Sequence, residues 1–485
     1  MHRKQTHARP GITRRECLIR LTAAAGLIGC AGGRIGAASA PPPTPPAAAP
    51  KRLVLTPDGG DRATGYVMSN KIARRNGNLV CTWLDFQRQN RWALVDPRSG
   101  EILRSGAVDT PRLDNHCGTA ITTDVDGTLH LLVGAHHGAF IHYRMEPDKA
   151  DWQPVEDGAA VGRQATYPSL VCGRDGTLHV TYRLETGGHD PELHYCRRPK
   201  EGPWSQPRAL ARSVVKEHSW LTGAIEVAET GRLHVVFSNT LPVPAQGDKA
   251  RYYGASHLYS DDAGQTWRQF GDAQPLAVAA DAAGLKRIEA PDMPPERIEA
   301  RYRTTGTLAL TSYYHKMVLS NPAIDPRGRP WVIVHNLLIG DALLYRHEEQ
   351  GGQGGQGTWI GVPLLEPVRT LLPGYRIRHC GQLSRRGDRS IEAVLMASPD
   401  AAPAWGAPGT TLVRLVFDAD ARLASKELVS PPDPAMPQWL PSLERWSPHA
   451  PFVRPALLYT RGLNAGGGKQ NVNEMKTEVG VEVGE

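Results

Sequence analysis

Glycines in polar turns recur along this chain at a spacing close to fifty residues. Successive glycines of this kind are 50, 49, 55, 97 and 59 residues apart, and they are Gly77, Gly127, Gly176, Gly231, Gly328 and Gly387. An apolar run follows each of them, such as Leu129–Val133 and Leu178–Tyr182. A turn and an apolar strand repeated every ~40–50 residues are typical of a β-propeller, which has one four-stranded sheet per repeat. The spacing therefore predicts an all-β fold.

The longest interval contains a second turn of a recognisable kind. Residues 260–267 read Ser-Asp-Asp-Ala-Gly-Gln-Thr-Trp, which matches the Asp-box Ser-x-Asp-x-Gly-x-Thr-Trp of sialidase-like propellers. In such a turn we expect Asp262 and Gly264 to close the loop and Trp267 to pack inward. The charged, proline-rich residues 275–303 that follow are predicted to be an insertion in the same blade. The motif indicates a propeller and does not indicate catalysis.

The end of the chain supplies a further, less regular unit. Phe452–Tyr459 is apolar, and Val472–Val483 alternates polar and apolar residues as a closing strand would. With six clear units before it, the chain is predicted to form a seven-bladed β-propeller. Because every repeat is part of one ring, residues 52–485 are expected to form a single large domain.

The first residues have the pattern of an export signal. Arg14-Arg15 precedes a short apolar stretch, Leu18–Gly29, which is shorter than the ~20 residues that span a bilayer. Residues 1–30 are therefore interpreted as a twin-arginine signal peptide, and residues 31–51 as an Ala/Pro-rich linker. Residues 27–30, Leu-Ile-Gly-Cys, resemble a bacterial lipobox, which would lipidate Cys30; the alternative is cleavage near Ala38–Ala40. The protein is thus expected in the periplasm, or at the outer membrane or cell surface as a lipoprotein, with membrane contact only through that lipid.

The net charge gives no reason to expect a nucleic-acid partner. The formal charge is +7, and the six Lys/Arg and one Glu of residues 1–30 account for +5 of it. The remaining chain is nearly balanced, so an anion site must come from local placement of Arg and His. Five cysteines follow the signal peptide without a disulfide or zinc-binding spacing, and free buried thiols are expected.

Two neighbouring hairpins place polar residues where a ligand would bind. Asp-Gly turns at 126–127 and 175–176 close one end of each hairpin, so the other ends carry His116 with His136, and Tyr167 with Arg183. If both hairpins open on the same face of the ring, two imidazoles, a phenol and a guanidinium gather at one rim. Such a set can move a proton next to an anion.

Other polar residues are weaker candidates for this rim. His137, Arg197, Arg198, His218 and His335 are predicted to bind substrate, although each is also explained as a loop or scaffold residue. Three histidines lie at the second position of the strand that follows a turn and are interpreted as structural: His130, His179 and His234. The main candidates also have structural explanations. His116 is explained as a core histidine, Tyr167 as packing at a blade edge, and Arg183 as part of a surface ion pair.

The order of five short motifs resembles a known family. Asn115-His116, Gly134-Ala135-His136, Thr166-Tyr167-Pro168, Tyr182-Arg183 and residues 194–198 (His-Tyr-Cys-Arg-Arg) resemble the BNR-repeat propeller proteins that include the ulvan lyases, over residues 60–465. The resemblance implies a seven-bladed propeller that cleaves uronate-containing polysaccharides by β-elimination. It matches His116 and His136 to the catalytic histidines of the family, and Tyr167 and Arg183 to its tyrosine and its carboxylate-neutralising arginine. Some relatives hold a structural zinc, for which possible ligands here are His315, His335 and Cys380.

The residue types suit that reaction. Arg183 can offset the charge of a uronate carboxylate, a neutral histidine can remove the C5 proton, and no cofactor is needed. The base is His136 or His116, and Tyr167 is favoured as the acid. Two other interpretations stay open: a sialidase-type glycoside hydrolase, supported by the Asp-box, and a glycan-binding propeller without catalytic activity.

Overall fold

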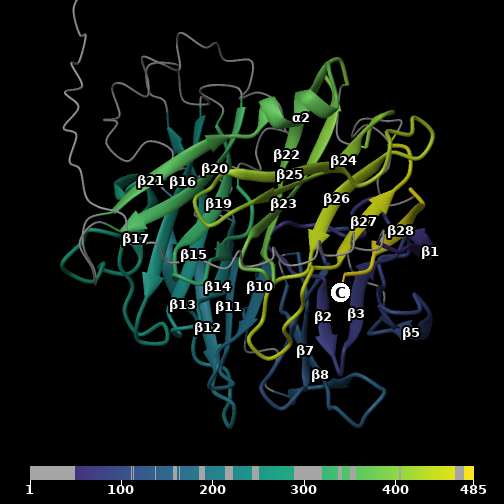
Figure 1. The fold of residues 1–485 in the computed structure, drawn as a ribbon. Coiled ribbons are helices and arrows are strands. Elements are labelled where there is room, and N and C mark those ends of the chain that lie inside the picture. The colour runs from purple at the N-terminus through teal and green to yellow at the C-terminus, as the bar shows by residue number, and fades with distance from the viewer. Residues whose placement is uncertain are drawn as a thin grey trace, which may run out of the picture. The chain divides into compact units, whose positions relative to one another are not determined.

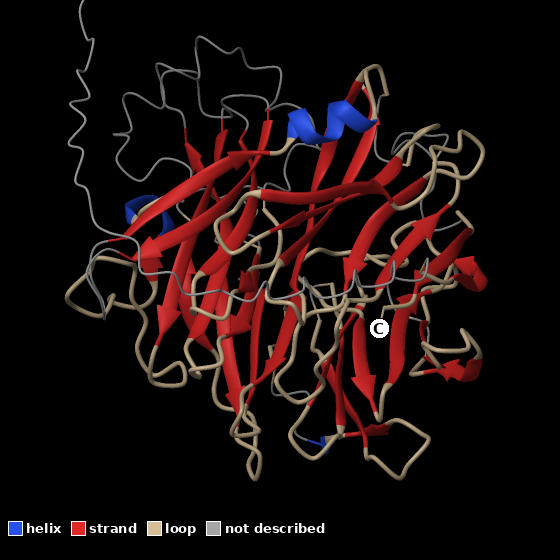
Figure 2. Cartoon of the chain, viewed as in Figure 1, coloured by secondary structure: helices blue, strands red, loops and turns tan. Residues whose placement is uncertain are grey.

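In the structure, a computed structural model, the regular secondary structure consists almost entirely of strands, which are arranged in seven sheets (Figures 1 and 2). It describes residues 50–484 apart from 111, 113, 137, 157–160, 163, 185–191, 214–221, 243–250, 289–318, 337–340, 350–356, 403–405 and 465–474. The leader and most of the linker lie outside this range, so the predictions about them stay predictions. Within the described residues no helix has the length and apolar character needed to span a bilayer.

The first four sheets follow one another along the chain. Sheet 1 contains β2 (Ile72–Arg75), β3 (Asn78–Leu84), β4 (Asn90–Val95) and β5 (Ile102–Ala107). Sheet 2 contains β6 (Thr119–Thr123), β7 (Leu129–Val133), β8 (Ile141–Met145) and β9 (Gln153–Pro154). Sheet 3 contains β10 (Ala165–Cys172), β11 (Leu178–Leu184), β12 (Glu192–Arg198) and β13 (Arg208–Arg212). Sheet 4 contains β14 (Gly223–Val227), β15 (Leu233–Pro242) and β16 (Arg251–Ser260).

The last three sheets complete the ring. Sheet 5 contains β18 (Ala323–Ile324), β19 (Pro330–Asn336), β20 (Asp341–Glu349) and β21 (Gly357–Pro363), and the short α2 (Leu365–Leu371) follows it. Sheet 6 contains β22 (Tyr375–Arg385), β23 (Ile391–Pro399), β24 (Thr411–Phe417) and β25 (Leu423–Leu428). Sheet 7 contains β26 (Gln438–Leu443), β27 (Leu457–Arg461), β28 (Thr477–Glu482) and, as its outer strand, β1 (Arg52–Gly59).

The predicted seven-bladed propeller is therefore confirmed, and its closure has one feature that the sequence did not indicate. The strand predicted at the end of the chain is β28, which pairs with β27 on one side and with β1 on the other. The first described strand of the chain thus completes the last sheet. This pairing joins the two ends of the ring by backbone hydrogen bonds.

The apolar core lies between adjacent sheets rather than in one central mass. Most buried clusters join two neighbours: for example, one contains Leu178 and Val180 of sheet 3 with Leu132 of sheet 2. Another joins Leu79 and Cys81 of sheet 1 to Leu458 and Val481 of sheet 7. Since a blade buries its faces only against its neighbours, every sheet depends on the ring being complete.

The turns explain why the predicted glycines recur. In the turn between β6 and β7, the Asp124 carboxylate accepts backbone hydrogen bonds from Asp126 (2.9 Å) and Thr128 (2.8 Å), and Gly127 has φ +80°. A positive φ suits glycine, which has no Cβ. Gly387 is the exception, because the positive φ of its turn belongs to Arg389. A Cβ on Gly387 would lie 2.6 Å from the Phe452 carbonyl oxygen, so close approach of the backbone requires glycine there.

The Asp-box forms the predicted loop. Asp262 accepts hydrogen bonds from the Thr266 backbone N–H (2.8 Å) and hydroxyl (2.6 Å), and Trp267 is completely buried. The predicted insertion that follows is described only up to residue 288. It contains β17 (Ala280–Asp281) and the 3₁₀ turn η3 (Ala282–Gly284), and β17 pairs in parallel with β13 of sheet 3. The loop and its extension therefore join sheets 3 and 4.

The structural histidines of the second strands follow one pattern. Nδ1 of His130, His179 and His234 lies at 3.0, 2.8 and 3.0 Å from a polar atom on the third strand of the same sheet, belonging to His142, Tyr195 and His257 respectively. Burial lowers the pKa of His179 to about 4 and that of His234 to about 3, so both are neutral at pH 7. These histidines are part of the packing between strands.

Buried neutral histidines predict that stability falls in mild acid. Below pH 6.5 the unfolded chain binds protons that these folded histidines cannot bind, so the free energy of unfolding decreases from about pH 6.5 downward. Seven described histidines have a lowered pKa. Four described carboxyl groups have a raised pKa, and their effect on the free energy of unfolding has the opposite sign. Thermal unfolding followed by circular dichroism is expected to give a Tm that falls as the pH is lowered from 6.5 to 4.5. A Tm that is constant or rises over that interval contradicts the prediction.

Candidate functional site

The hairpin of sheet 2 brings His116 and His136 together. His116 precedes β6 and His136 follows β7, and Thr119 of β6 pairs with Val133 of β7. Beyond this pair the Gly134 N–H donates to the Gly118 carbonyl oxygen at 3.0 Å. A Cβ on Gly134 would lie 2.1 Å from that oxygen, so only glycine allows the two chains to stay this close. The ring centroids of the two histidines are 4.2 Å apart, with planes inclined by 24°.

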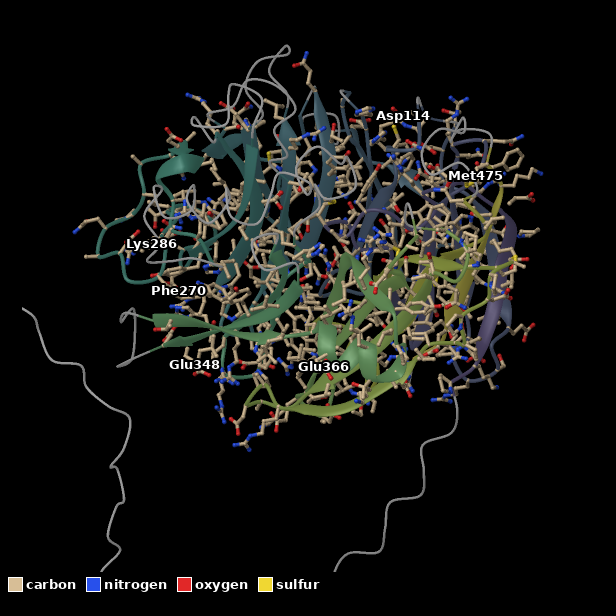
Figure 3. The ribbon with its side chains drawn as sticks, turned by 90° about the horizontal axis from the view of Figure 1, so that it is seen from above. Asp114, Phe270, Lys286, Glu348, Glu366 and Met475 are labelled. Carbon is tan, nitrogen blue, oxygen red and sulfur yellow. The ribbon has the colours of Figure 1, made fainter. Side chains whose placement is uncertain are left out.

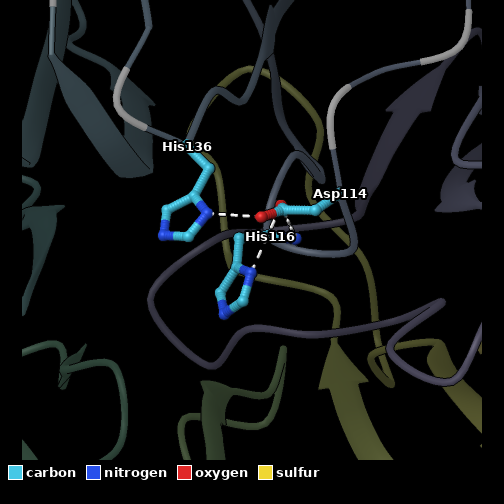
Figure 4. A group of neighbouring side chains, drawn as sticks. All are labelled: Asp114, His116 and His136. Atoms are coloured by element: carbon cyan, nitrogen blue, oxygen red, sulfur yellow. Dashed lines mark hydrogen bonds and ion pairs between the residues drawn. The ribbon is translucent and has the colours of Figure 1, made fainter. Parts of the chain in front are cut away.

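One carboxylate, that of Asp114, holds both imidazoles (Figure 4; Asp114 is also labelled in Figure 3). Its Oδ1 lies 3.2 Å from His116 Nδ1 and accepts the His116 backbone N–H at 2.8 Å, while its Oδ2 is hydrogen-bonded to His136 Nδ1. Burial acts to raise the pKa of Asp114, but the hydrogen bonds from the two histidines outweigh it and lower that pKa below its usual range. An ionised Asp114 accepts a hydrogen bond from His136 Nδ1–H, which leaves the lone pair of that ring on Nε2.

The second nitrogen of His116 faces a guanidinium. Arg62 Nη1 lies 2.7 Å from His116 Nε2. Because arginine only donates, His116 Nε2 is the acceptor and its proton lies on Nδ1, toward Asp114. Burial lowers the pKa of His116 to about 4, and the charge of Arg62 acts in the same direction. His116 is therefore a neutral group whose lone pair is occupied by Arg62.

Arg62 is itself held by its neighbours. It lies 3.6 Å from the Asp61 carboxylate, donates to the Tyr66 hydroxyl, and approaches Asn115 Oδ1 at 3.5 Å. Asn115 Nδ2 donates in turn to both Asp61 oxygens, at 3.0 and 3.1 Å. Burial raises the pKa of Asp61 to about 6. This network connects the segment after β1 to the segment before β6.

Tyr167 and Arg183 come from the hairpin of sheet 3. Tyr167 has φ +61° and lies at a bulge where the register of β10 against β11 shifts between Thr166 and Ser169. A positive φ is unusual for a bulky residue and marks a position that the surrounding structure holds in place. The Tyr167 ring lies 6.1 Å from the His116 ring, and the Arg183 guanidinium carbon is 4.8 Å from the centroid of Tyr167. All four predicted catalytic residues thus lie in one cluster.

Three further members of this cluster were not assigned roles from sequence. Tyr66 stacks on His116 (5.7 Å between centroids) and meets Tyr167 edge-on (4.6 Å), and Arg62 and Asp114 make the contacts described above. Asp114 lies two residues before His116, and a carboxylate at that spacing was the available signal. Arg62 and Tyr66 precede the first strand of another sheet, and nothing in their local sequence distinguishes them.

Among the remaining predicted residues, Arg197 and Arg198 lie at the opposite end of their blade, and three others lie outside the described range. Arg198 pairs with Leu178 at the turn end of sheet 3, opposite to His116, and Arg197 beside it donates to the Ala263 carbonyl oxygen of the Asp-box loop at 3.0 Å. Because β11 and β12 are antiparallel, the end of β12 lies beside the start of β11. Both arginines are therefore at the opposite end of the blade from Arg183 and do not belong to the site. His335 lies near the end of β19 in sheet 5. His137, His218 and His315 fall outside the described residues.

The cluster does not have the geometry of a metal site. Within the described part of the chain, Asp114, His116 and His136 are one group that places three metal-binding atoms within 4.8 Å of one another. A metal bound to imidazole lies in the ring plane, ~2.0–2.1 Å from nitrogen. Two nearly parallel rings 4.2 Å apart, each directed at a different oxygen of Asp114, cannot both meet that condition. The arrangement suits protons shared with a carboxylate. The zinc predicted at His315, His335 and Cys380 stays a prediction, because the side chains of His315 and Cys380 are not described.

The described cysteines agree with the expectation of free thiols. Cys81, Cys117, Cys172 and Cys196 are unpaired by disulfides and buried. Burial raises the pKa of all four, to about 11 for Cys196. They therefore behave as small apolar residues of the core.

Comparison with known proteins agrees with the fold. The profile of a family described as "BNR repeat-containing family member" matches residues 69–353. The structure is similar to that of a polysaccharide lyase described as a PL25 ulvan lyase, with a TM-score of 0.57 and 11% identity over 90% of this chain and 96% of the other; the same protein bound to -[GlcA(1-4)Rha3S]- gives equal values. It is also similar to the polysaccharide lyase Uly1, with a TM-score of 0.52 and 14% identity over 90% and 99% of the two chains. No curated protein sequence matches the chain.

The contact between Arg62 and His116 predicts a measurable titration. Substituting Arg62→Met removes a positive charge and a donor from His116 Nε2, so the pKa of His116 is expected to rise from about 4 toward 6.5. Nuclear magnetic resonance of ¹⁵N-labelled imidazoles across pH 3–8 measures this shift. Arg91→Met removes an arginine that pairs with Asp85, outside the cluster, and serves as the control. An unchanged His116 titration in the Arg62 variant contradicts the assignment of the Nδ1–H form.

Proposed function

This chain belongs to the BNR repeat-containing family, and on that premise we propose that it is a polysaccharide lyase that cleaves a uronate-containing, ulvan-like anionic polysaccharide by β-elimination. The observation that carries the proposal is the cluster in which Asp114 holds His136 and His116 beside Tyr167 and Arg183. Solved structures with the same fold support it, since those most similar to this one include ulvan lyases, one of them bound to an oligosaccharide of glucuronate and sulfated rhamnose. A propeller alone does not define an activity, so the proposal depends on the residues of the site.

The reaction requires a base, an acid and a group that offsets negative charge. The base removes the proton from C5 of the uronate, the C5–H electrons form the C4=C5 double bond, and the C4–O4 bond breaks as the acid donates a proton to the leaving oxygen. Removal of the proton places charge on the uronate carboxylate. A guanidinium is always charged and binds a carboxylate through two hydrogen bonds, which suits Arg183 to this role.

His136 is the better base of the two histidines. Asp114 accepts a hydrogen bond from its Nδ1–H, so Nε2 carries the lone pair, and the side chain is 22% exposed. In contrast, His116 Nε2 accepts from Arg62, and its pKa of about 4 makes it a weak base. His116 serves to fix one side of the Asp114 carboxylate and to pack against both tyrosines. This favours His136 over His116, the choice that the sequence leaves open.

Tyr167 is the proposed acid. Its ring centroid lies 6.1 Å from that of His116 and 4.8 Å from the Arg183 guanidinium carbon, so the side chain belongs to the same cluster as the base. The neighbouring cation favours the phenolate that forms when Tyr167 gives up its proton. Tyr167 is near the start of β10, where the bulge and its positive φ set the direction of the side chain.

A sialidase-type hydrolase is less well supported. That chemistry uses three arginines on one carboxylate, a Tyr/Glu nucleophile and an Asp acid, whereas the described cluster contains a histidine pair on Asp114 with Arg62 and Arg183. The other alternative, a glycan-binding propeller without catalytic activity, is distinguished from a lyase by experiment.

The test is incubation with a panel of uronate polymers. A lyase produces an ultraviolet-absorbing double bond, a hydrolase produces reducing ends without that absorbance, and a binding protein produces neither.

Single substitutions test the roles on a polymer that the parent protein cleaves. His136→Ala and Arg183→Ala are expected to lower kcat by about 10²–10⁴-fold, because each removes a group that acts on the reacting atoms. Asp114→Asn is expected to lower kcat by at least about tenfold, because an amide does not hold His136 in the Nδ1–H form. Initial rates of absorbance gain measure these effects.

A matched histidine variant controls for loss of structure. His449 Nε2 lies 2.8 Å from the Gly173 carbonyl oxygen at the turn end of sheet 3, away from the cluster. His449→Ala is expected to keep the parental kcat. Parental activity in a folded His136→Ala or Arg183→Ala protein rejects the assigned roles.

A further inference from the structure

Arg445 is a buried arginine that connects parts of the chain far apart in sequence. It follows β26 by two residues and is 7% exposed. Its Nη2 donates to the carbonyl oxygens of Met68 (2.7 Å) and Val67 (3.2 Å), and its Nη1 donates to the Ser169 hydroxyl (3.0 Å) and the Ile225 carbonyl oxygen (3.4 Å). One guanidinium thus contacts the segment after β1, strand β10 and strand β14.

Two of these three segments lie next to residues of the candidate site. Val67 and Met68 directly follow Tyr66, and Ser169 is two residues after Tyr167. The same two segments are also joined to each other, because the Ser69 hydroxyl donates to the Pro168 carbonyl oxygen at 2.6 Å. Tyr66 and Tyr167 meet edge-on at 4.6 Å. The backbone that carries this pair of rings is therefore held in place by Arg445.

The cost of burying this charge argues against a role in stability alone. A carboxylate on β14, that of Glu226, is the opposite charge whose field acts on Arg445, and burial raises the pKa of Glu226 to about 7. Lys71 is a second buried basic group, and burial followed by the charge of Arg445 lowers its pKa to about 7. Burying a charge costs free energy, and here the hydrogen bonds to carbonyl oxygens and to Ser169 offset that cost while fixing the geometry of the groups that accept them. A cavity of about 30 Å³ lined by Asn70, Glu226 and Arg445 leaves room for water beside the guanidinium.

We propose that Arg445 is a positioning residue that sets the placement of Tyr66 and Tyr167, and through Tyr66 that of Arg62 against His116. Its hydrogen bonds fix three carbonyl oxygens and one hydroxyl, and apolar side chains of the same size cannot replace them. Loss of Arg445 removes its hydrogen bonds to Val67 and Met68, and displacement of that segment also displaces Arg62, which donates to the Tyr66 hydroxyl. The effect on turnover rests on the proposed lyase function; the effect on His116 does not.

The experiment compares two buried arginines. Arg445→Met removes the guanidinium, and Arg445→Lys keeps the charge with fewer donors. The matched control is Arg414→Lys, since Arg414 on β24 is also buried and bonds to Glu392 (2.7 Å) and Glu427 (2.5 Å) of sheet 6 and to Glu482 of sheet 7. For each protein we measure Tm, the titration of ¹⁵N-labelled His116, and kcat and KM on a cleaved polymer.

The expected pattern separates positioning from folding. Arg445→Met is expected to raise the pKa of His116 by at least about one unit. It is also expected to lower kcat by at least about tenfold, with KM within about threefold, because misplacing an acid beside bound substrate affects turnover more than binding. Arg445→Lys is expected to lie between this variant and the parent. Arg414→Lys is expected to lower Tm while leaving both the His116 titration and kcat within about twofold of the parent.

Every other outcome counts against the role of Arg445 or against the proposed lyase function. A folded Arg445→Met protein with an unchanged His116 titration and kcat within about twofold of the parent overturns it. If Arg445→Met does not fold at the assay temperature, Arg445→Lys is judged by the same two measurements, and a parental result there also overturns it. If the parent cleaves no uronate polymer, the proposed function fails, and the His116 titration still decides the role of Arg445.

Discussion

Pairing of β1 with β28 is the interaction on which the rest of the molecule depends. Each sheet buries its faces only against its two neighbours, so an open ring would expose the faces of sheets 1 and 7, which now share Leu79, Cys81, Leu458 and Val481 in one cluster. The pairing is tight at its end: a Cβ on Gly59 would lie 2.8 Å from the side chains of Thr477 and Val479. Closing the ring with β1 therefore fixes the position of the segment that follows β1.

The candidate site uses that fixed point. The segment from residue 60 to residue 70, which leaves β1 and carries Arg62 and Tyr66, is held on sheet 7 by hydrogen bonds from the Thr477 hydroxyl to the Gly60 carbonyl oxygen (2.6 Å) and from the Thr64 hydroxyl to the Leu440 carbonyl oxygen (2.6 Å). It then meets sheets 2 and 3 at His116 and Tyr167. Residues from the start, the first half and the end of the chain thus act together because the ring has been closed.

Within the site, one carboxylate gives two similar residues different properties. Asp114 faces Nδ1 of both histidines, and the difference between them comes from the opposite side of each ring. His116 meets a guanidinium and is buried, so its pKa falls to about 4, whereas the His136 side chain remains 22% exposed. The electrostatic environment, rather than residue type, therefore distinguishes the two imidazoles.

The repeat, the turns and the local partners of the site follow from the amino-acid sequence alone. Gly127 and Gly176 mark hairpins whose register depends on neighbouring residues, so the sequence was enough to place His116 with His136, and Tyr167 with Arg183, at strand ends. The folded ring was needed to show that Arg62 and Tyr66 join them, that Arg445 bonds to residues beside Tyr66 and Tyr167, and that Arg197 and Arg198 lie at the other end of the blade. Hairpin pairing is set by residues close in the chain, whereas these other contacts cross from one blade to another and exist only once seven sheets have packed into a closed ring.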